Sequence, residues 1–288
     1  MRTLEHTALR DVCREVVLIR KIIIASLLAA AAVGLVAGCG SGEDPAALLA
    51  DCGKAVDTYA QGSGYLHFVQ ETEYRLGTSQ GEFGQELRVE GDIIFPDREA
   101  YEYRETLSSS GQSEQPQENA FSYLTLDGGR TAYVMGKRLS AELGVLGWIH
   151  YTPLSDQNRY FDYVASVSRL TSVGGEPEWL GYEDLNGDRC ARVRYSITGQ
   201  ELVDLRLQDD PSVAEQYQGL DMGEIMGELL VEMWIGEADD LPLQVVMDQT
   251  VSLEDGTNST TRLLMVFSAY GEEPPLLIEA PAFFNEAV

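Results

Sequence analysis

The sequence contains little histidine and little cysteine, the residue types that most often bind transition metals. Only three histidines and four cysteines occur among its 288 residues. None of them lies at metal-ligand spacing around Cys52 or Cys190, so we expect no metal site and no cofactor. We interpret His67 and His150 as packed or surface imidazoles rather than general bases.

Basic residues are scarce as well. The chain has 20 lysines and arginines against 47 acidic residues. Residues 1–38 contain five of the basic and three of the acidic residues, so residues 39–288 have 15 basic and 44 acidic side chains and a net charge of −29. Such a surface repels phosphate groups. We therefore expect no nucleic-acid partner and no membrane attachment through a basic patch.

Long hydrophobic runs are absent after residue 38, and only one precedes it. Arg20-Lys21 is followed by seventeen uncharged residues, "IIIASLLAAAAVGLVAG", which is typical of an export signal. Its end, Val36-Ala37-Gly38-Cys39, resembles the lipobox of bacterial lipoproteins. The resemblance implies a signal peptide over residues 1–38 and a diacylglyceryl group on Cys39. The alternative is an uncleaved N-terminal anchor, and both interpretations place the rest of the chain outside the cytoplasmic membrane.

A short tether would then join the lipid to the folded part. Two acyl chains hold a protein on a bilayer stably, whereas one holds it only marginally. Residues 39–44 form the expected tether, and the five residues from Gly40 to Asp44, at about 3.5 Å each, reach roughly 17 Å. Residues 45–288 are expected to form a single domain close to the membrane.

Helical patterns occur at three places. Asp44-Pro45 reads as an N-cap with proline at the first helical position. Apolar residues then recur at helical spacing up to Tyr59, which predicts a helix over residues 45–60. The same spacing predicts a second helix over residues 155–170 and a third beginning at Asp210-Pro211.

The rest of the chain alternates with a period of two, which is typical of strands. In "CARVRYSI", residues 190–197, Val193 and Tyr195 face one way while Arg192 and Arg194 face the other. We count nine or ten strands, at 65–74, 86–95, 100–107, 121–126, 131–136, 190–197, 228–235, 243–253 and 261–270, with the "GWIHY" of residues 147–151 as a further strand or a turn. Short turns such as Asn186-Gly187 separate them. The pattern indicates an α+β fold in which one large antiparallel sheet is covered by helices on a single face.

The order of five segments is similar to that in the LolA-like lipoprotein carriers and their lipidated actinobacterial relatives of the LppX and LprG type. These segments, which lie within residues 45–270, are "GDIIFPD" (91–97), "LDGGRTAYVMGKRL" (126–139), "GWIHY" (147–151), "GYEDLNGDRCARVRY" (181–195) and "VEMWIGEADDLPLQVVM" (231–247). The resemblance implies a curved half-barrel of about ten strands wrapped around two or three helices. It also implies a hydrophobic cavity for the acyl chains of a lipid, glycolipid or lipoprotein, and it offers no catalytic residues.

Candidate cavity residues come from the apolar faces of the predicted strands. They are Leu87, Val89, Ile93, Phe95, Tyr101, Tyr103, Phe121, Tyr123, Tyr133, Val193, Tyr195, Val231, Met233, Val245 and Met247. The alternative for each of them is packing in a closed core. A rival interpretation of the whole chain is an envelope sensor or protein-interaction module on the same fold, with an envelope protein as its partner.

Three features leave alternatives open. Cys52 and Cys190 either form a disulfide in an oxidising compartment or remain two buried thiols. The segment from Gly199 to Gly227 is either a lid over the cavity or a solvated insertion. "GTSQG", residues 77–81, matches the nucleophile elbow of hydrolases at Ser79, but a polar stretch surrounds it, so we interpret it as a hairpin loop and expect no enzyme.

Overall fold

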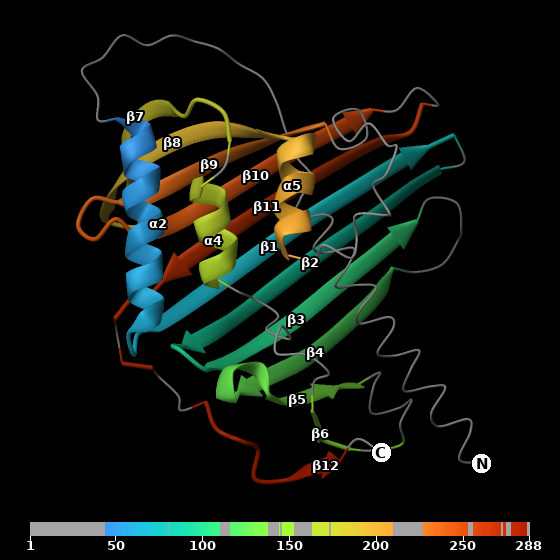
Figure 1. Ribbon diagram of the computed structural model, residues 1–288. Coiled ribbons are helices and arrows are strands. Elements are labelled where there is room, and N and C mark those ends of the chain that lie inside the picture. Colours follow the sequence, from blue (N-terminus) through green and yellow to red (C-terminus); the bar gives the residue numbers. More distant parts are fainter. Residues whose placement is uncertain are drawn as a thin grey trace.

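The twelve strands in the described part of the chain form one sheet, as the computed structural model shows (Figure 1). The structure describes residues 44–286 except 80, 110–115, 138–143, 145, 153–162, 173, 210–226, 253–255, 272 and 275–277. The strand order is β12-β6-β5-β4-β3-β2-β1-β11-β10-β9-β8-β7. All neighbouring strands are antiparallel except β12 and β6, which run parallel. The sheet is curved and open, and the predicted α+β half-barrel is confirmed.

Most strands match or extend the predicted segments, although β2, β10 and β11 end one or two residues before the predicted ends and β7 was not predicted. Their bounds are β1 Tyr65–Thr78, β2 Gly81–Ile94, β3 Arg98–Ser109, β4 Gln117–Leu126, β5 Thr131–Gly136, β6 Trp148–Tyr151, β7 Glu178–Leu185, β8 Asp188–Thr198, β9 Glu228–Gly236, β10 Pro242–Ser252, β11 Asn258–Ser268 and β12 Phe284–Glu286. A 3-10 turn, η1 (Asp127–Gly129), joins β4 to β5. The predicted two-residue turn joins β7 to β8, where Asn186 and Gly187 both have the positive φ that a type I′ turn requires.

Helix α2 (Pro45–Gln61) confirms the first helical prediction. The Asp44 side chain caps it by accepting a hydrogen bond of 3.0 Å from the amide of Ala46. Its buried face includes Cys52, Gly53 and Val56. A Cβ atom on Gly53 would lie 2.6 Å from Thr171 Oγ1, so glycine allows α2 to approach helix α4 closely.

The other two helices differ from the predictions. Helix α4 (Tyr163–Ser172) covers the second half of the predicted segment and packs against α2; residues 155–162 lie outside the described part. Helix α5 (Gly199–Asp209) packs against β8 and occupies the start of the segment that we interpreted as an insertion or lid. The predicted third helix, from Asp210 onward, also lies outside the described residues. Among the described helices, none is both long and apolar enough to cross a membrane.

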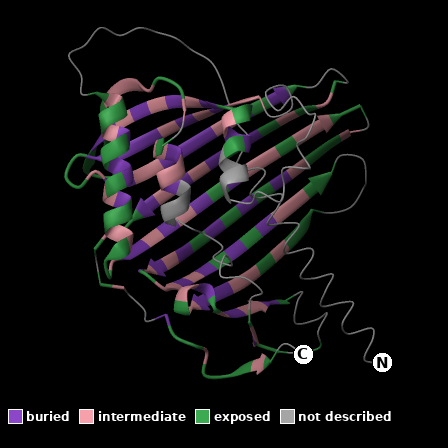
Figure 2. Cartoon of the chain, viewed as in Figure 1, coloured by how far each residue is buried: buried purple, intermediate pink, exposed green. Residues whose placement is uncertain are grey.

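All three helices lie on one face of the sheet, which we call the concave face (Figure 1). Along most of the long strands, such as β2, β3, β8 and β11, buried side chains alternate with half-buried or exposed ones, and they align across neighbouring strands as stripes (Figure 2). The main hydrophobic core joins the concave face to Val56 of α2, Val167 of α4 and Leu202 of α5. The strand alternation therefore places one apolar face of the sheet under the helices and leaves the other, the outer face, for charged side chains.

Gly91 permits the close pairing of β2 and β3. A Cβ atom at this position would lie 2.4 Å from both the carbonyl oxygen of Ala100 and Cβ of Tyr101. Because the sheet backbone cannot move away easily, we expect Gly91→Ala to lower the free energy of unfolding by about 1–3 kcal/mol. The matched control in the same strand is Gly84→Ala, whose Cβ meets the movable Ser108 Oγ. Urea denaturation of both variants checks this, and equal stability losses would contradict the explanation.

Two arginines hold one carboxylate on the outer face of β8 and β9. Nη2 of Arg192 and Nη2 of Arg194 each lie 2.6 Å from a carboxylate oxygen of Glu232. Burial alone raises the pKa of Glu232, but the hydrogen bonds and charges of the two arginines outweigh it and lower the pKa below its ordinary value. The ionised Glu232 therefore stabilises the folded protein at pH values above the ordinary pKa of glutamate. This stabilisation is lost as the pH falls through the lowered pKa of the folded state.

We expect Glu232→Gln to lower the free energy of unfolding at pH 7 by about 1.5–3 kcal/mol, the contribution of a hydrogen bond to a charged group. Glu102→Gln is the control, because Glu102 pairs with Arg104 on the same face but both side chains are more than 60% exposed. We expect that control to cost less than about 1 kcal/mol. Denaturation at several pH values should show the Glu232→Gln difference shrinking in acid. A difference that is independent of pH would be the contrary result.

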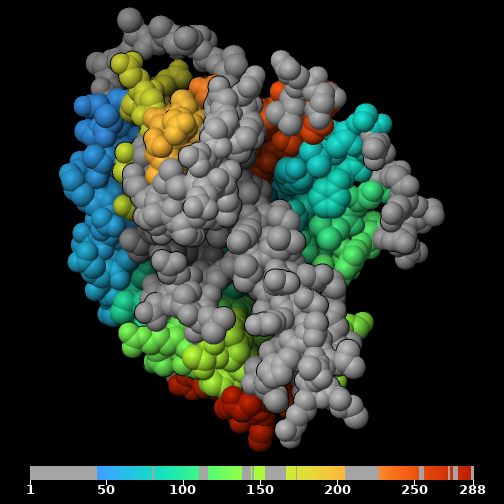
Figure 3. All heavy atoms as spheres, turned by 45° about the vertical axis from the view of Figure 1, so that its right-hand side comes forward, coloured from blue at the N-terminus to red at the C-terminus, as the bar shows by residue number. Residues whose placement is uncertain are grey.

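The last residues of the chain add a strand at one edge of the sheet. Phe284 pairs with Trp148, and Nδ1 of His150 lies 2.7 Å from the carboxylate oxygen Oε2 of Glu286. This C-terminal segment (red) lies at the base of the molecule in the space-filling view (Figure 3). Strand β12 was not predicted, because three residues are too few to show a period.

Candidate functional site

The candidate site is the concave face of the sheet. Thirteen of the fifteen predicted cavity residues belong to the main core there. They are Leu87, Val89, Ile93, Phe95, Tyr101, Tyr103, Tyr123, Val193, Tyr195, Val231, Met233, Val245 and Met247. Phe121 is half-buried and packs against the same core. The strand alternation therefore placed these side chains on one continuous apolar surface that extends from β8 to β4; that they line a cavity stays a prediction.

Aromatic rings cover the concave face of β3 and β4. Tyr101 stacks on Tyr123 with ring centroids 4.9 Å apart, and Tyr103 stacks on Phe121 at 4.3 Å. The partners of each pair are directly opposite in the β3–β4 register, which brings cross-strand rings into contact. On β1, Phe68 is 1% exposed and lies opposite Phe267 of β11. These rings extend the buried apolar surface of the main core across this part of the sheet.

Tyr133 is a correction, because it lies on the outer face. It pairs with Leu124 in the β4–β5 register and belongs to a separate cluster with Leu124 and Ile278. The sequence could not show this, since Ala132, Tyr133 and Val134 are consecutive apolar residues without alternation. The register with β4 decides which of them faces the helices, and it selects Ala132 and Val134.

Sequence reasoning missed part of the apolar surface. Leu66 and Phe68 on β1, and Leu263, Met265 and Phe267 on β11, are all buried in the main core. Both segments were predicted as strands, but no face was assigned to either. Their period-two spacing in the sequence was the signal that could have identified them.

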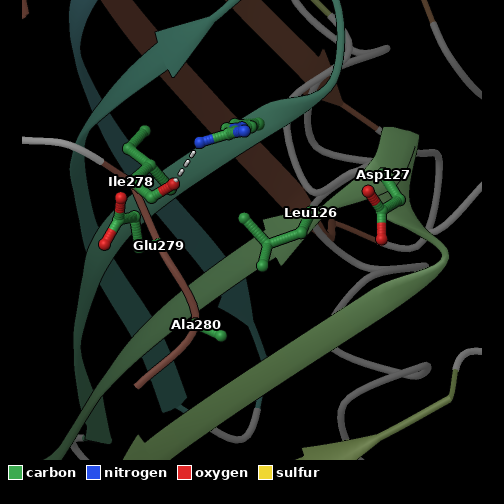
Figure 4. A pocket seen from close by; sticks show the side chains of 6 residues that line it. Leu126, Asp127, Ile278, Glu279 and Ala280 are labelled. Carbon is green, nitrogen blue, oxygen red and sulfur yellow. Dashed lines mark hydrogen bonds between the residues drawn. The ribbon is translucent and has the colours of Figure 1, made fainter. Parts of the chain in front are cut away.

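A pocket of about 200 Å³ lies on the outer side of the sheet, away from the predicted cavity. It is lined by Arg98, Leu126, Asp127, Ile278, Glu279 and Ala280 (Figure 4). Arg98 donates a hydrogen bond of 3.0 Å to the carbonyl oxygen of Ile278 and thereby holds the C-terminal segment against β3. The pocket thus marks where this segment crosses the sheet.

Both cysteines of the described part are buried free thiols. Cys52 of α2 lies in the main core, with Sγ 3.9 Å from Sδ of Met233. Cys190 belongs to a different cluster with Trp234 and Val246. Burial raises the pKa of both thiols. Of the two alternatives for this pair, the structure therefore contains the buried thiols, held in their protonated, unreactive form.

The remaining candidates fall outside a catalytic arrangement. Ser79 lies in the hairpin between β1 and β2, whereas a nucleophile elbow needs a helix after the serine. His67 Nδ1 lies 2.9 Å from Asp92 Oδ1 on the outer face. Cys39 and the tether up to residue 43 lie outside the described residues, so the lipid attachment site stays a prediction.

Two solved lipoprotein structures resemble this chain. The chain is similar to LprF from Mycobacterium bovis. The two share 15% sequence identity with a TM-score of 0.49, over 84% of this chain and 99% of LprF. The lipoprotein LppX from Mycobacterium tuberculosis matches with 15% identity and a TM-score of 0.41, over 81% of this chain and 98% of LppX.

LppX is one of the proteins that the sequence landmarks resemble. No protein-family model matches the chain, and the comparison with curated proteins finds no match. Both identities are low and both TM-scores lie below 0.5, so the function is argued from the residues of this chain.

Proposed function

We propose that the protein is a membrane-anchored lipoprotein on the extracytoplasmic side, which binds acyl chains between its helices and the concave face. It would carry or present a lipid, glycolipid or lipoprotein. The observation that supports this most is the continuous apolar and aromatic surface from β8 to β4 under three helices. The hydrophobic effect has no preferred direction and depends on the apolar area that is buried. Such a surface therefore suits a ligand that has no polar groups along its length.

The hydrophobic free energy of burying an acyl chain could support extraction of a lipid without any covalent reaction. Each buried methylene group contributes about 0.8 kcal/mol. A sixteen-carbon chain would therefore gain up to roughly 12 kcal/mol before the costs of association are subtracted. The lipid on Cys39 would keep the domain at the membrane from which the ligand comes.

The experiment uses a form that starts at Gly40, because all described elements lie between Asp44 and Glu286. We expect saturable binding of a fluorescent fatty acid. Val89→Phe should weaken this binding about tenfold, since Val89 lies in the main core on the concave face and a ring would occupy ligand space. Val69→Phe on the neighbouring strand is the control, because Val69 pairs with the outward residue Glu90. Absence of binding by the parent form, or equal effects of both changes, would count against the proposal.

One observation favours the second candidate function, a protein-interaction module. Leu146 and Phe283 are 90% and 89% exposed, and the Asn285 side chain donates to the carbonyl oxygen of Leu146 at 2.9 Å. The two projecting apolar side chains therefore belong to segments that are joined at the β6–β12 edge. If this edge binds an envelope protein, Leu146→Ser with Phe283→Ser would abolish a cross-link to that protein and leave fatty-acid binding unchanged.

A further inference from the structure

The concave face is apolar over only part of its length. Eight buried polar side chains lie on it. Two of them, Glu99 of β3 and Thr125 of β4, are directly opposite each other. The other six lie on five neighbouring strands, and we call these six the polar patch. They are Gln249 of β10, Thr261 of β11, Gln70 and Thr72 of β1, Gln85 of β2 and Glu105 of β3. Burying polar groups costs free energy that apolar residues would not cost. Core packing alone therefore does not explain why polar side chains occupy these positions.

The strand register shows that the polar residues gather toward one end of the strands. Gln249 pairs with Thr261, Thr261 with Tyr74, and Tyr74 with Gln85, which makes one polar row across four strands. The next row along the strands joins Thr72 to Leu87 and Leu87 to Glu105.

Beyond Gln70, the rows toward the other end of the strands become aromatic. Phe68 lies opposite Phe267, and Tyr101 opposite Tyr123. The concave face is thus itself amphipathic. It has a mainly aromatic half, which also buries the pair of Glu99 and Thr125, and a polar half that contains the polar patch.

Glu105 is the charged member of the polar patch. It is 3% exposed, and its two carboxylate oxygens accept one hydrogen bond each, from Gln85 Nε2 at 2.6 Å and from Asn119 Nδ2 at 2.9 Å. Within the described part of the chain, no lysine, arginine or histidine forms an ion pair with it. A carboxylate offers about four acceptor sites, so Glu105 can accept further hydrogen bonds from a ligand.

From this arrangement we infer that the ligand has a hydrogen-bond-donating head without negative charge, a hydroxyl or an ammonium group, which lies on the polar patch against Glu105. The inference rests on the proposed function, because the acyl chains would occupy the aromatic half. An anionic head would be repelled by the buried carboxylate at short range. A donor head would use the acceptor sites of Glu105 that Gln85 and Asn119 leave open.

The test compares three probes with the same alkyl chain and different heads: dodecylamine, dodecanol and laurate. Their affinities for the form that starts at Gly40 are measured by displacement of Nile red, a neutral dye, below the micelle concentration. We expect dodecylamine and dodecanol to bind about tenfold or more tightly than laurate, the effect of one hydrogen bond to a charged group. Tighter binding of dodecylamine than of dodecanol would indicate a site for an ammonium group, and tighter binding of dodecanol would indicate a site for a hydroxyl group.

Glu105→Gln should remove most of this preference and bring the three affinities together. Glu102→Gln is the matched control, because Glu102 is on the same strand but is exposed on the outer face, and it should leave the preference unchanged. Circular dichroism checks that each variant is folded. If Glu105→Gln does not fold, Gln85→Met serves instead. Because Gln85 holds the Glu105 carboxylate in position through its 2.6 Å hydrogen bond, its loss should reduce the preference for dodecanol over laurate several-fold.

The outcomes separate the inference from the proposed function. Equal binding of the three probes by the parent form, or tighter binding of laurate, would overturn the donor head while leaving acyl binding in place. An unchanged preference in folded Glu105→Gln would also overturn it. If none of the probes binds, the proposed function fails, and the inference fails with it.

Discussion

Cys39→Ser is expected to abolish incorporation of palmitate into the protein completely and to leave residues 1–38 attached to the chain. The physical reason is that, under the proposed function, the diacylglyceryl group would be attached through the thiol of Cys39 and cleavage would occur directly before this residue; serine offers no thiol. Without the lipid, the net charge of −29 over residues 39–288 would give the domain no attraction of its own for anionic headgroups. Metabolic labelling with palmitate and the intact mass of the purified protein measure both effects.

The control for this prediction is Cys52→Ser, because Cys52 is buried in α2 and far from solvent. It should retain the label and the mass of a chain that begins at residue 39. An unlabelled wild-type protein that still carries residues 1–38 would contradict the lipoprotein interpretation. That result would favour the alternative of an uncleaved N-terminal anchor.

The second large effect concerns the aromatic half of the concave face. Phe68→Ala is expected to lower the free energy of unfolding by about 3–5 kcal/mol, since Phe68 is 1% exposed in the main core and its removal leaves a cavity. For a domain of this size, such a loss corresponds to roughly 6–20 °C in the melting temperature. Calorimetry of the form that starts at Gly40 would measure it.

Phe83→Ala is the control for Phe68→Ala. Phe83 lies near the start of the neighbouring strand β2 and is 36% exposed. Its removal should therefore lower the free energy of unfolding by less than about 1.5 kcal/mol. A fatty acid that occupies the new space should restore part of the lost stability of Phe68→Ala through its binding free energy. Similar losses for the two phenylalanines would show that the concave face is not the main core.

The sequence was most informative where its period was regular. The alternation of Val193 and Tyr195 with Arg192 and Arg194 predicted both faces of β8, and Asp44-Pro45 predicted the start of α2, because each of these signals is local. Helix α5 was missed although Thr198 and Glu201 form a capping box, in which Glu201 Oε2 accepts from the amide of Thr198 at 2.7 Å. Its signal, a threonine followed three residues later by glutamate, was present in the sequence.

Features that depend on strand pairing could not be read from the sequence. Tyr133 was assigned to the wrong face because its neighbours are apolar as well, and only the register with Leu124 places it. The polar patch was missed for a similar reason. Gln70, Gln85 and Glu105 are far apart in the sequence and meet only because β1, β2 and β3 are neighbours in the sheet.

The central claim is that the concave face holds acyl chains, and native mass spectrometry tests it most directly. The form that starts at Gly40 would be purified without detergent from a bacterial host and analysed before and after extraction with organic solvent. The account predicts a mass excess equal to one or more acyl lipids, which extraction removes and which Val89→Phe reduces. A protein that shows only its bare mass, and that remains bare after incubation with fatty acids, would contradict the account.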